Sequence, residues 1–125
     1  MGKNHSPKFL ATVEQSRKVI NECDIDAFSA MLNDGNQLTV IDVREQHEFD
    51  AGSFEGALHL SKGVIERDVE KHPISETDRI VLYCGGGFRS ALAAESLARM
   101  GYANVYSLWG GWRSLVAAGL ATPNQ

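Results

Sequence analysis

One run of six residues constrains the fold of this chain more than any other feature. Leu38-Thr39-Val40-Ile41-Asp42-Val43 is almost continuously apolar and rich in β-branched side chains. A strand that is apolar on both faces is typical of a parallel sheet, because helices cover both sides of such a sheet. Parallel strands also need helical connections, so we expect strands and helices to alternate along the rest of the chain.

The hydrophobic pattern outside this run follows that alternation. We expect helices over residues 9–18, 25–34, 44–50, 64–69, 89–100 and 110–118, and further strands over 19–20, 57–60, 79–83 and 104–108. The leading helix is amphipathic, with its apolar positions at Phe9, Leu10 and Val13. The order of elements predicts a three-layer α/β domain with parallel pairing and right-handed connections.

Composition places the chain among ordinary globular domains. Its 125 residues are enough for one domain with a real core. A net charge of −4 without lysine or arginine runs argues against nucleic-acid or membrane-surface binding. Two cysteines without metal or disulfide spacing, and no apolar stretch like a signal peptide or membrane span, favour a soluble, reducing, cytoplasmic setting. We expect a monomer without metal or organic cofactor.

The domain organisation follows from the same pattern. We expect an N-terminal tail and leading helix over residues 1–18, one compact domain over 19–120 and a short C-terminal tail over 121–125. Residues 1–8 have a polar start and run into a helix at Ser6-Pro7, so we expect little function there.

The strongest chemical signal follows the predicted strand that ends at Tyr83. Cys84 comes next, then Gly85-Gly86-Gly87, and then Phe88-Arg89-Ser90 opens a helix. A thiol acts as a nucleophile only as the thiolate, and a helix N-terminus, free backbone N–H groups and a nearby guanidinium all favour that anion. Glycines allow successive N–H groups to turn inward and cradle an anion. We therefore expect Cys84 to be a nucleophile and this loop to bind its substrate.

Several neighbouring residues allow both a functional and a structural interpretation. Arg89 lies where the helix dipole disfavours a cation, which predicts that it serves a bound anion or aligns the loop. For Ser90, an ordinary first-turn position and a hydroxyl contact to the sulfur are equally good interpretations. Asp42 and Arg44 stand at the end of a strand, at the same edge of the predicted sheet as Cys84, so they could border the site. The i,i+4 spacing of Arg44 and Glu48 favours a structural pair instead.

The remaining cysteine, histidines and tryptophans give weaker signals. Cys23 lacks a glycine cradle or a basic neighbour, so we expect it to be inert. The four histidines show no metal-ligand spacing. Trp109 and Trp112 flank two glycines, where core packing is the default and one ring could form part of a pocket wall.

A family resemblance rests on several of these motifs in one register. They are Asp42-Val43-Arg44-Glu45, Glu48-Phe49 with Gly52 and Gly56-Ala57, Tyr83-Cys84 with Arg89-Ser90, Gly101-Tyr102 with Asn104-Val105-Tyr106, and Gly110-Gly111. Over residues 19–120 the chain resembles a single-domain rhodanese. It departs from the family at Ser53 and Glu55, where histidine and proline are common, and at Leu115, where tryptophan is common.

The resemblance implies a fold and an activity. The fold is a sheet of about five mainly parallel strands flanked by helices. The activity is sulfur transfer, in which Cys84 carries sulfane sulfur as a persulfide and the residues from Gly85 to Arg89 wrap it. Thiosulfate or a thiol persulfide would be the donor, and cyanide, a small thiol or a protein thiol the acceptor.

Two other functions stay open at this point. Cysteine-dependent phosphatases and arsenate reductases share the fold and place a cysteine and an arginine around a similar loop, but they resemble C-x5-R, whereas four residues separate Cys84 from Arg89 here. A binding module without catalysis is the third alternative. The presence of Cys84 weakens it, since inactive family members typically replace that residue.

Overall fold

Five parallel strands form one sheet at the centre of the molecule. The computed structural model describes residues 5–124. The strands are β1 (Asn21–Cys23), β2 (Thr39–Asp42), β3 (Leu58–His59), β4 (Ile80–Tyr83) and β5 (Val105–Leu108), in the spatial order β1-β5-β4-β2-β3. Every neighbouring pair is parallel, as the alternation of strands and helices predicts.

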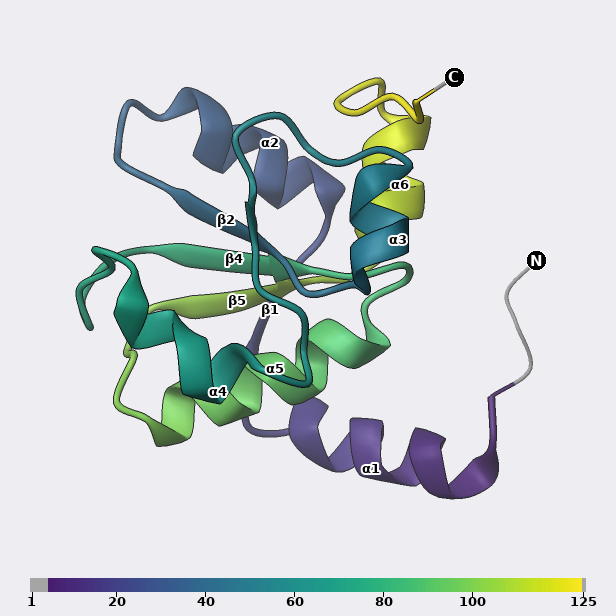
Figure 1. Ribbon diagram of the computed structural model, residues 1–125, viewed down its shortest axis with the longest axis vertical. Helices are drawn as coiled ribbons and strands as arrows, with labels where there is room; N and C mark the ends of the chain where they lie inside the picture. The colour runs from purple at the N-terminus through teal and green to yellow at the C-terminus, as the bar shows by residue number, and fades with distance from the viewer. Residues whose placement is uncertain (1–4, 125) are drawn as a thin grey trace.

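Helices cover both faces of the sheet. They are α1 (Pro7–Arg17), α2 (Ile25–Asn33), α3 (Gln46–Asp50), α4 (Ile65–Asp68), α5 (Phe88–Arg99) and α6 (Gly111–Ala117), and a short 3₁₀ helix, η1 (Val69–Lys71), follows α4. Figure 1 shows α2 and α6 on one side of the sheet and α4 and α5 on the other, with α1 packed outside α5. The three-layer α/β prediction is confirmed. None of the helices within residues 5–124 is long and apolar enough to cross a membrane.

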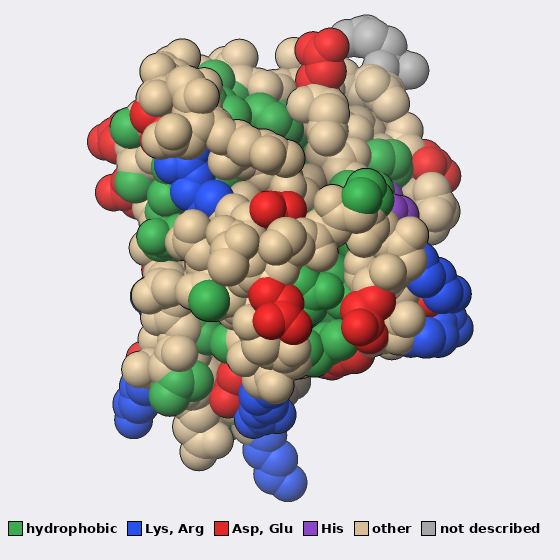
Figure 2. All heavy atoms as spheres, turned by 90° about the vertical axis from the view of Figure 1, so that its left-hand side faces the viewer, with side chains coloured by type: hydrophobic (Ala, Val, Ile, Leu, Met, Phe, Trp, Pro, Cys, Tyr) green, Lys and Arg blue, Asp and Glu red, His purple; other side chains and the backbone are tan. Residues whose placement is uncertain are grey.

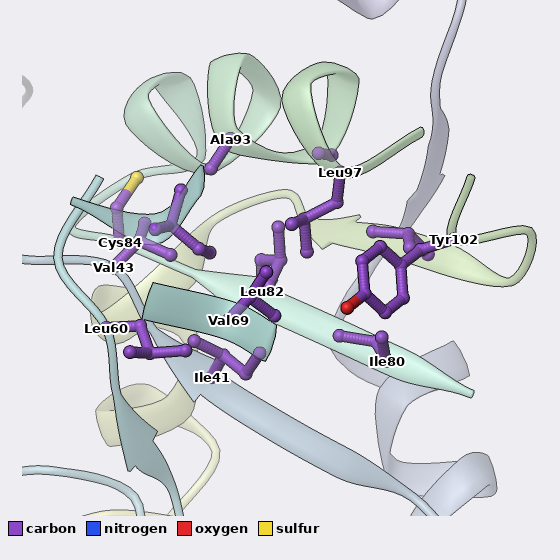
Figure 3. Packing of buried hydrophobic residues seen from close by; sticks show 13 residues of the cluster. Ile41, Val43, Leu60, Val69, Ile80, Leu82, Cys84, Ala93, Leu97 and Tyr102 are labelled. Atoms are coloured by element: carbon purple, nitrogen blue, oxygen red, sulfur yellow. The ribbon is translucent and has the colours of Figure 1, made fainter. Parts of the chain in front are cut away.

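Successive residues of the buried strands point to opposite faces and so build two cores. Ile80 and Leu82 of β4 lie in the cluster beneath α4 and α5 with Leu97, which Figure 3 shows. Val81 and Tyr83 of the same strand lie in the other cluster, which also contains the following buried residues: Cys23, Phe28, Val40, Leu108 and Leu115. All four residues of β4 are fully buried, so the strand that leads to Cys84 is held from both sides.

The chain differs from the sequence-based expectation near its N-terminus. The first strand is β1 at Asn21–Cys23, whereas Val19, expected to begin a strand, has 64% of its surface exposed. The reason is that the turn after α1 continues past the helix, with the Val19 N–H donating to the Ser16 carbonyl at 3.1 Å. Leu10 of α1 is also exposed, and the helix buries Val13 and Ser16 instead.

The parallel register gathers the functional segments at one end of the sheet. Asp42 of β2 pairs with Tyr83 of β4, so the residues that follow these two strands emerge side by side. In Figure 1 this is the right-hand end, where α3, α6 and the turn before α5 meet. Figure 2 shows the opposite end, where hydrophobic side chains form separate small areas among acidic and basic ones.

Candidate active site

Cys84 lies directly after β4, at the base of a loop that opens helix α5. Only 1% of its surface is exposed, and Figure 3 shows it at the end of the buried cluster beside α5. Its sulfur accepts two backbone hydrogen bonds, from the Gly87 N–H at 3.2 Å and the Ser90 N–H at 3.3 Å. The loop therefore wraps its own cysteine and directs two backbone donors at the sulfur.

Further N–H groups of the loop are free to receive an anion. The backbone N–H groups of Gly85, Gly86, Phe88 and Arg89 have no acceptor within residues 5–124. Gly87, the residue before α5, has a φ of +112°, which an L side chain rarely adopts. The glycine-rich loop thus combines a left-handed turn with unpaired donors at a helix start, an arrangement suited to binding an oxyanion or an anionic sulfur.

Two buried serine hydroxyl groups form a short hydrogen-bonded series that starts at the Cys84 sulfur. The Cys84 S–H donates to the Ser90 Oγ at a distance of 3.6 Å. The same Ser90 Oγ lies 2.8 Å from the Ser107 Oγ on β5. Both serines are fully buried. Of the two interpretations of Ser90, the structure supports the hydroxyl contact to sulfur. Ser107 lies outside the motifs that the sequence analysis describes, although a polar residue in a buried strand is a recognisable signal.

Arg89 is paired with a carboxylate at the pocket wall. Its guanidinium donates to both oxygens of Glu48, at 2.8 and 3.1 Å. The hydrogen bonds from Arg89 lower the pKa of Glu48 to about 2, against the opposing effect of burial. Glu48 is the third residue of α3, which starts with a capping box in which the Glu48 side chain accepts from the Glu45 N–H. The pair therefore ties the loop after Cys84 to α3.

Arg44 pairs with Asp42 rather than with Glu48, so the expected i,i+4 pair is wrong. The Arg44 Nη2 lies 2.8 Å from the Asp42 carboxylate and also donates to the Gly52 carbonyl at 2.6 Å. The guanidinium stacks 4.5 Å from the centre of the Trp112 ring. The reason for the different pairing is that α3 begins only at Gln46, so Arg44 lies before the helix and outside its periodicity.

The start of α6 is fastened to the loop by backbone hydrogen bonds. The Trp112 N–H donates to the Cys84 carbonyl at 2.7 Å, and the Arg113 N–H donates to the Gly85 carbonyl at 3.3 Å. Gly111 lies between the two segments with a φ of +49°, and a Cβ there would be 2.9 Å from the Gly85 carbonyl carbon. Only glycine fits this close approach, which holds the loop against α6.

A pocket of about 590 Å³ opens above the loop. Its wall includes the loop residues Cys84, Gly85, Gly86, Phe88 and Arg89, and the residues that other elements contribute: His5, Phe9, Arg44, His47, Glu48, Trp112 and Arg113. Trp112 thus forms part of the wall, whereas Trp109 packs on Phe88 with ring centres 5.5 Å apart.

Part of the N-terminal segment, for which the sequence predicts little function, lines this pocket through His5. The His5 ring lies 4.7 Å from the Phe88 ring in an edge-to-face arrangement, and Phe9 lies 6.3 Å from the same ring. Arg17 of α1 covers the Trp109 ring at 3.7 Å. Helix α1 is therefore docked beside the loop after Cys84. Residues 1–4 lie outside the described residues.

Cys23 has different surroundings from Cys84. It is buried in the core at the end of β1, and burial raises the pKa of its thiol to about 11, with Asp24 and Glu22 adding to the effect. It does not line the pocket. These features agree with the prediction that Cys23 is inert.

Comparison with known proteins identifies the family. Residues 24–118 match the rhodanese-like domain, and the chain belongs to this family. A Bacillus subtilis protein named as a putative sulfur carrier, YrkF, is 29% identical over 94 residues, which are 75% of this chain and 50% of that protein. A sulfurtransferase from Allochromatium vinosum is 31% identical over 93 residues, 74% of this chain and 85% of that protein. The chain thus spans about half the length of the first relative and most of the second.

Solved structures share the fold across nearly the whole chain. The polysulfide-sulfur transferase homodimer from Wolinella succinogenes superposes with a TM-score of 0.79 at 25% identity, covering 94% of this chain and 88% of that chain. A protein from Rhodopseudomonas palustris described as a possible tyrosine phosphatase gives a TM-score of 0.76 at 23% identity, with 100% and 99% covered. The rhodanese-like fold is confirmed.

Proposed function

We propose that this protein is a sulfurtransferase that carries sulfane sulfur as a persulfide on Cys84. The observation that carries the proposal is the pair of backbone N–H groups, from Gly87 and Ser90, directed at a sulfur on the floor of the pocket. Relatives named as a sulfur carrier and as a sulfurtransferase support it. Thiosulfate or a thiol persulfide is the proposed donor, and cyanide or a thiol the acceptor.

The reaction proceeds in two nucleophilic steps. The Cys84 thiolate attacks the outer sulfur of thiosulfate, the sulfur–sulfur bond of the donor breaks, and sulfite leaves with the bonding electron pair. The new Cys84 persulfide anion lies among the free N–H groups of Gly85, Gly86, Phe88 and Arg89. Cyanide or a thiolate then attacks the outer sulfur, and Cys84 leaves as the thiolate. Fixed N–H dipoles stabilise the negative charge in both steps.

The site is less suited to phosphoester or arsenate chemistry. Phosphoryl transfer in a cysteine loop needs a cation within the loop that is free to hold the phosphoryl group, and a proton donor for the leaving oxygen. Arg89, the cation of the loop, is already bound at two points by Glu48. Glu48 is the one carboxylate in the described pocket wall, and its pKa of about 2 keeps it ionised near neutral pH. Four residues between Cys84 and Arg89 also make a smaller ring of donors.

Mass spectrometry of the intact protein tests the proposal. After incubation with thiosulfate and removal of excess donor, we expect a mass increase of one sulfur atom on Cys84, lost on addition of cyanide with release of thiocyanate. Incubation with a phosphoester is the parallel sample. A phosphorylated Cys84, or an unmodified protein in the thiosulfate sample, would refute sulfur transfer at this site.

A further inference from the structure

Three arginines line the described pocket, and they differ in their charge balance. Arg44 forms an ion pair with Asp42, and Arg89 forms one with Glu48. Arg113 is exposed and has no carboxylate within 4 Å among residues 5–124. Within the described wall it is therefore the one guanidinium whose charge is not already matched, and it is available to a bound anion.

The position of Arg113 is fixed relative to the nucleophile. Its backbone N–H donates to the Gly85 carbonyl, one residue after Cys84. Its Nη1 lies 3.5 Å from the point that a Cβ on Gly86 would occupy, so the guanidinium reaches along the loop. A ligand whose reacting sulfur meets Cys84 can therefore present an anionic group to Arg113 within the same pocket.

The rest of the wall favours an organic ligand over a small inorganic ion. Phe9 and Phe88 contribute apolar rings, and His5 packs against Phe88. The pocket volume of about 590 Å³ is in the range of sites for organic molecules. Thiosulfate and cyanide are each the size of a few water molecules, which take up about 30 Å³ apiece in the liquid. They would leave most of the pocket unfilled.

We propose that Arg113 determines acceptor specificity by binding the carboxylate of a small organic thiol. This inference rests on the proposed sulfur transfer at Cys84. The thiolate of the acceptor attacks the outer sulfur of the Cys84 persulfide, the bond between that sulfur and Cys84 breaks, and Cys84 leaves as the thiolate. The acceptor leaves as an organic persulfide, so atoms and charge balance. Arg113 holds the carboxylate end, and the apolar rings contact the carbon chain.

Two acceptors that differ chiefly in one charge provide the test. With thiosulfate as the common donor, kcat/KM is measured for 3-mercaptopropionate and for 2-mercaptoethanol, and their ratio describes the preference for a carboxylate. We expect Arg113→Gln to lower this ratio about tenfold, which corresponds to about 1.4 kcal/mol. Arg113→Lys, which keeps the charge but loses the two-pronged geometry, should retain part of the preference.

The control is Arg67→Gln, at an exposed arginine that pairs with Asp68 outside the pocket and should keep the wild-type ratio. If Arg113→Gln leaves the ratio unchanged while mass spectrometry still detects the Cys84 persulfide, the proposed role of Arg113 is overturned and the proposed function is not. Absence of the persulfide in the wild-type protein would overturn the proposed function itself. The two failures are therefore distinguishable.

Discussion

Glu48 and Arg89 lie 41 positions apart in the chain and meet at the pocket wall through two hydrogen bonds of 2.8 and 3.1 Å. The pair joins α3, which follows β2, to the loop that follows β4. The sequence predicts that Arg89 serves an anion or aligns the loop, and this contact favours alignment. A guanidinium that is held at two points by a carboxylate has a fixed orientation. The carboxylate also neutralises most of the charge with which the guanidinium could attract an anionic sulfur donor.

Removing Arg89 should therefore harm the loop mainly by leaving Glu48 unpaired. We expect Arg89→Ala to reduce kcat/KM with thiosulfate by about 10²-fold, since an uncompensated carboxylate then faces the anionic donor. The double variant Arg89→Ala, Glu48→Gln should recover part of this loss, with a coupling energy of about 0.5–3 kcal/mol. Steady-state kinetics of the wild type, both single variants and the double variant give this value. Strictly additive losses would contradict the pairing.

The same pair predicts a contribution to stability that depends on pH. The pKa of Glu48 is about 2 in the folded protein, below the ordinary value of 4.5. A lowered pKa means that the stabilisation is fully present above about pH 4.5 and disappears as the pH falls through about 2. We expect Glu48→Gln to lower the free energy of unfolding by about 1–2 kcal/mol at pH 7. The difference from wild type should shrink toward pH 2 in urea titrations. A constant difference across this range would show that the charge of Glu48 is not responsible.

The two cysteines should differ sharply in chemistry. We expect Cys84→Ser to abolish sulfur transfer while the protein stays folded, because oxygen at this position cannot form the persulfide. Cys23→Ser should keep most of the activity, since Cys23 lies outside the pocket. Near neutral pH, iodoacetamide should modify Cys84 in the Cys23→Ser variant much faster than it modifies Cys23 in the Cys84→Ser variant. The reason is that the pKa of about 11 leaves Cys23 almost entirely protonated. Equal rates would contradict this assignment.

Gly111 should be intolerant of any side chain. Alanine there would place its Cβ against the Cys84 carbonyl oxygen and 2.9 Å from the Gly85 carbonyl carbon, at a φ of +49°. We expect Gly111→Ala to lower the free energy of unfolding by about 1–3 kcal/mol and to reduce sulfur transfer, because the loop must shift. Gly63→Ala is the matched control, since a Cβ at that position has no neighbour within 4 Å. Denaturant unfolding and kinetics of both variants check the prediction, which a fully active Gly111→Ala protein would contradict.

The parts of the fold that depend on local pattern could be predicted from the sequence. The buried strands around Ile41 and Leu82 and the helix after Cys84 follow from apolar runs and a glycine break, and they are present. A strand is expected over residues 19–20 because Val19 and Ile20 are apolar, whereas the pairing of β1 with β5 depends on the register between Asn21 and Tyr106. Register between distant segments leaves no periodic signal in a single sequence.

The candidate site likewise has a part that local sequence predicts and a part that depends on distant segments. The position of Cys84 and its glycine loop could be predicted, because every part of that arrangement is adjacent in the chain. The partners that come from other elements could not, since Glu48, Ser107 and Arg113 reach the loop only through the folded sheet. His5 gave no signal at all, because an isolated histidine near a chain end usually has no contact with a site.

The hydrogen bonds between α6 and the loop also bear on when the site forms during synthesis. The carbonyls of Cys84 and Gly85 are held by the N–H groups of Trp112 and Arg113, which leave the ribosome well after the cysteine does. A nascent chain that ends at α5 contains the thiol but lacks the segment that fixes its cradle. Assembly of this loop is thus deferred until α6 has been synthesised, and a chain that stops before α6 has the sulfur atom without the hydrogen bonds that hold its loop in place.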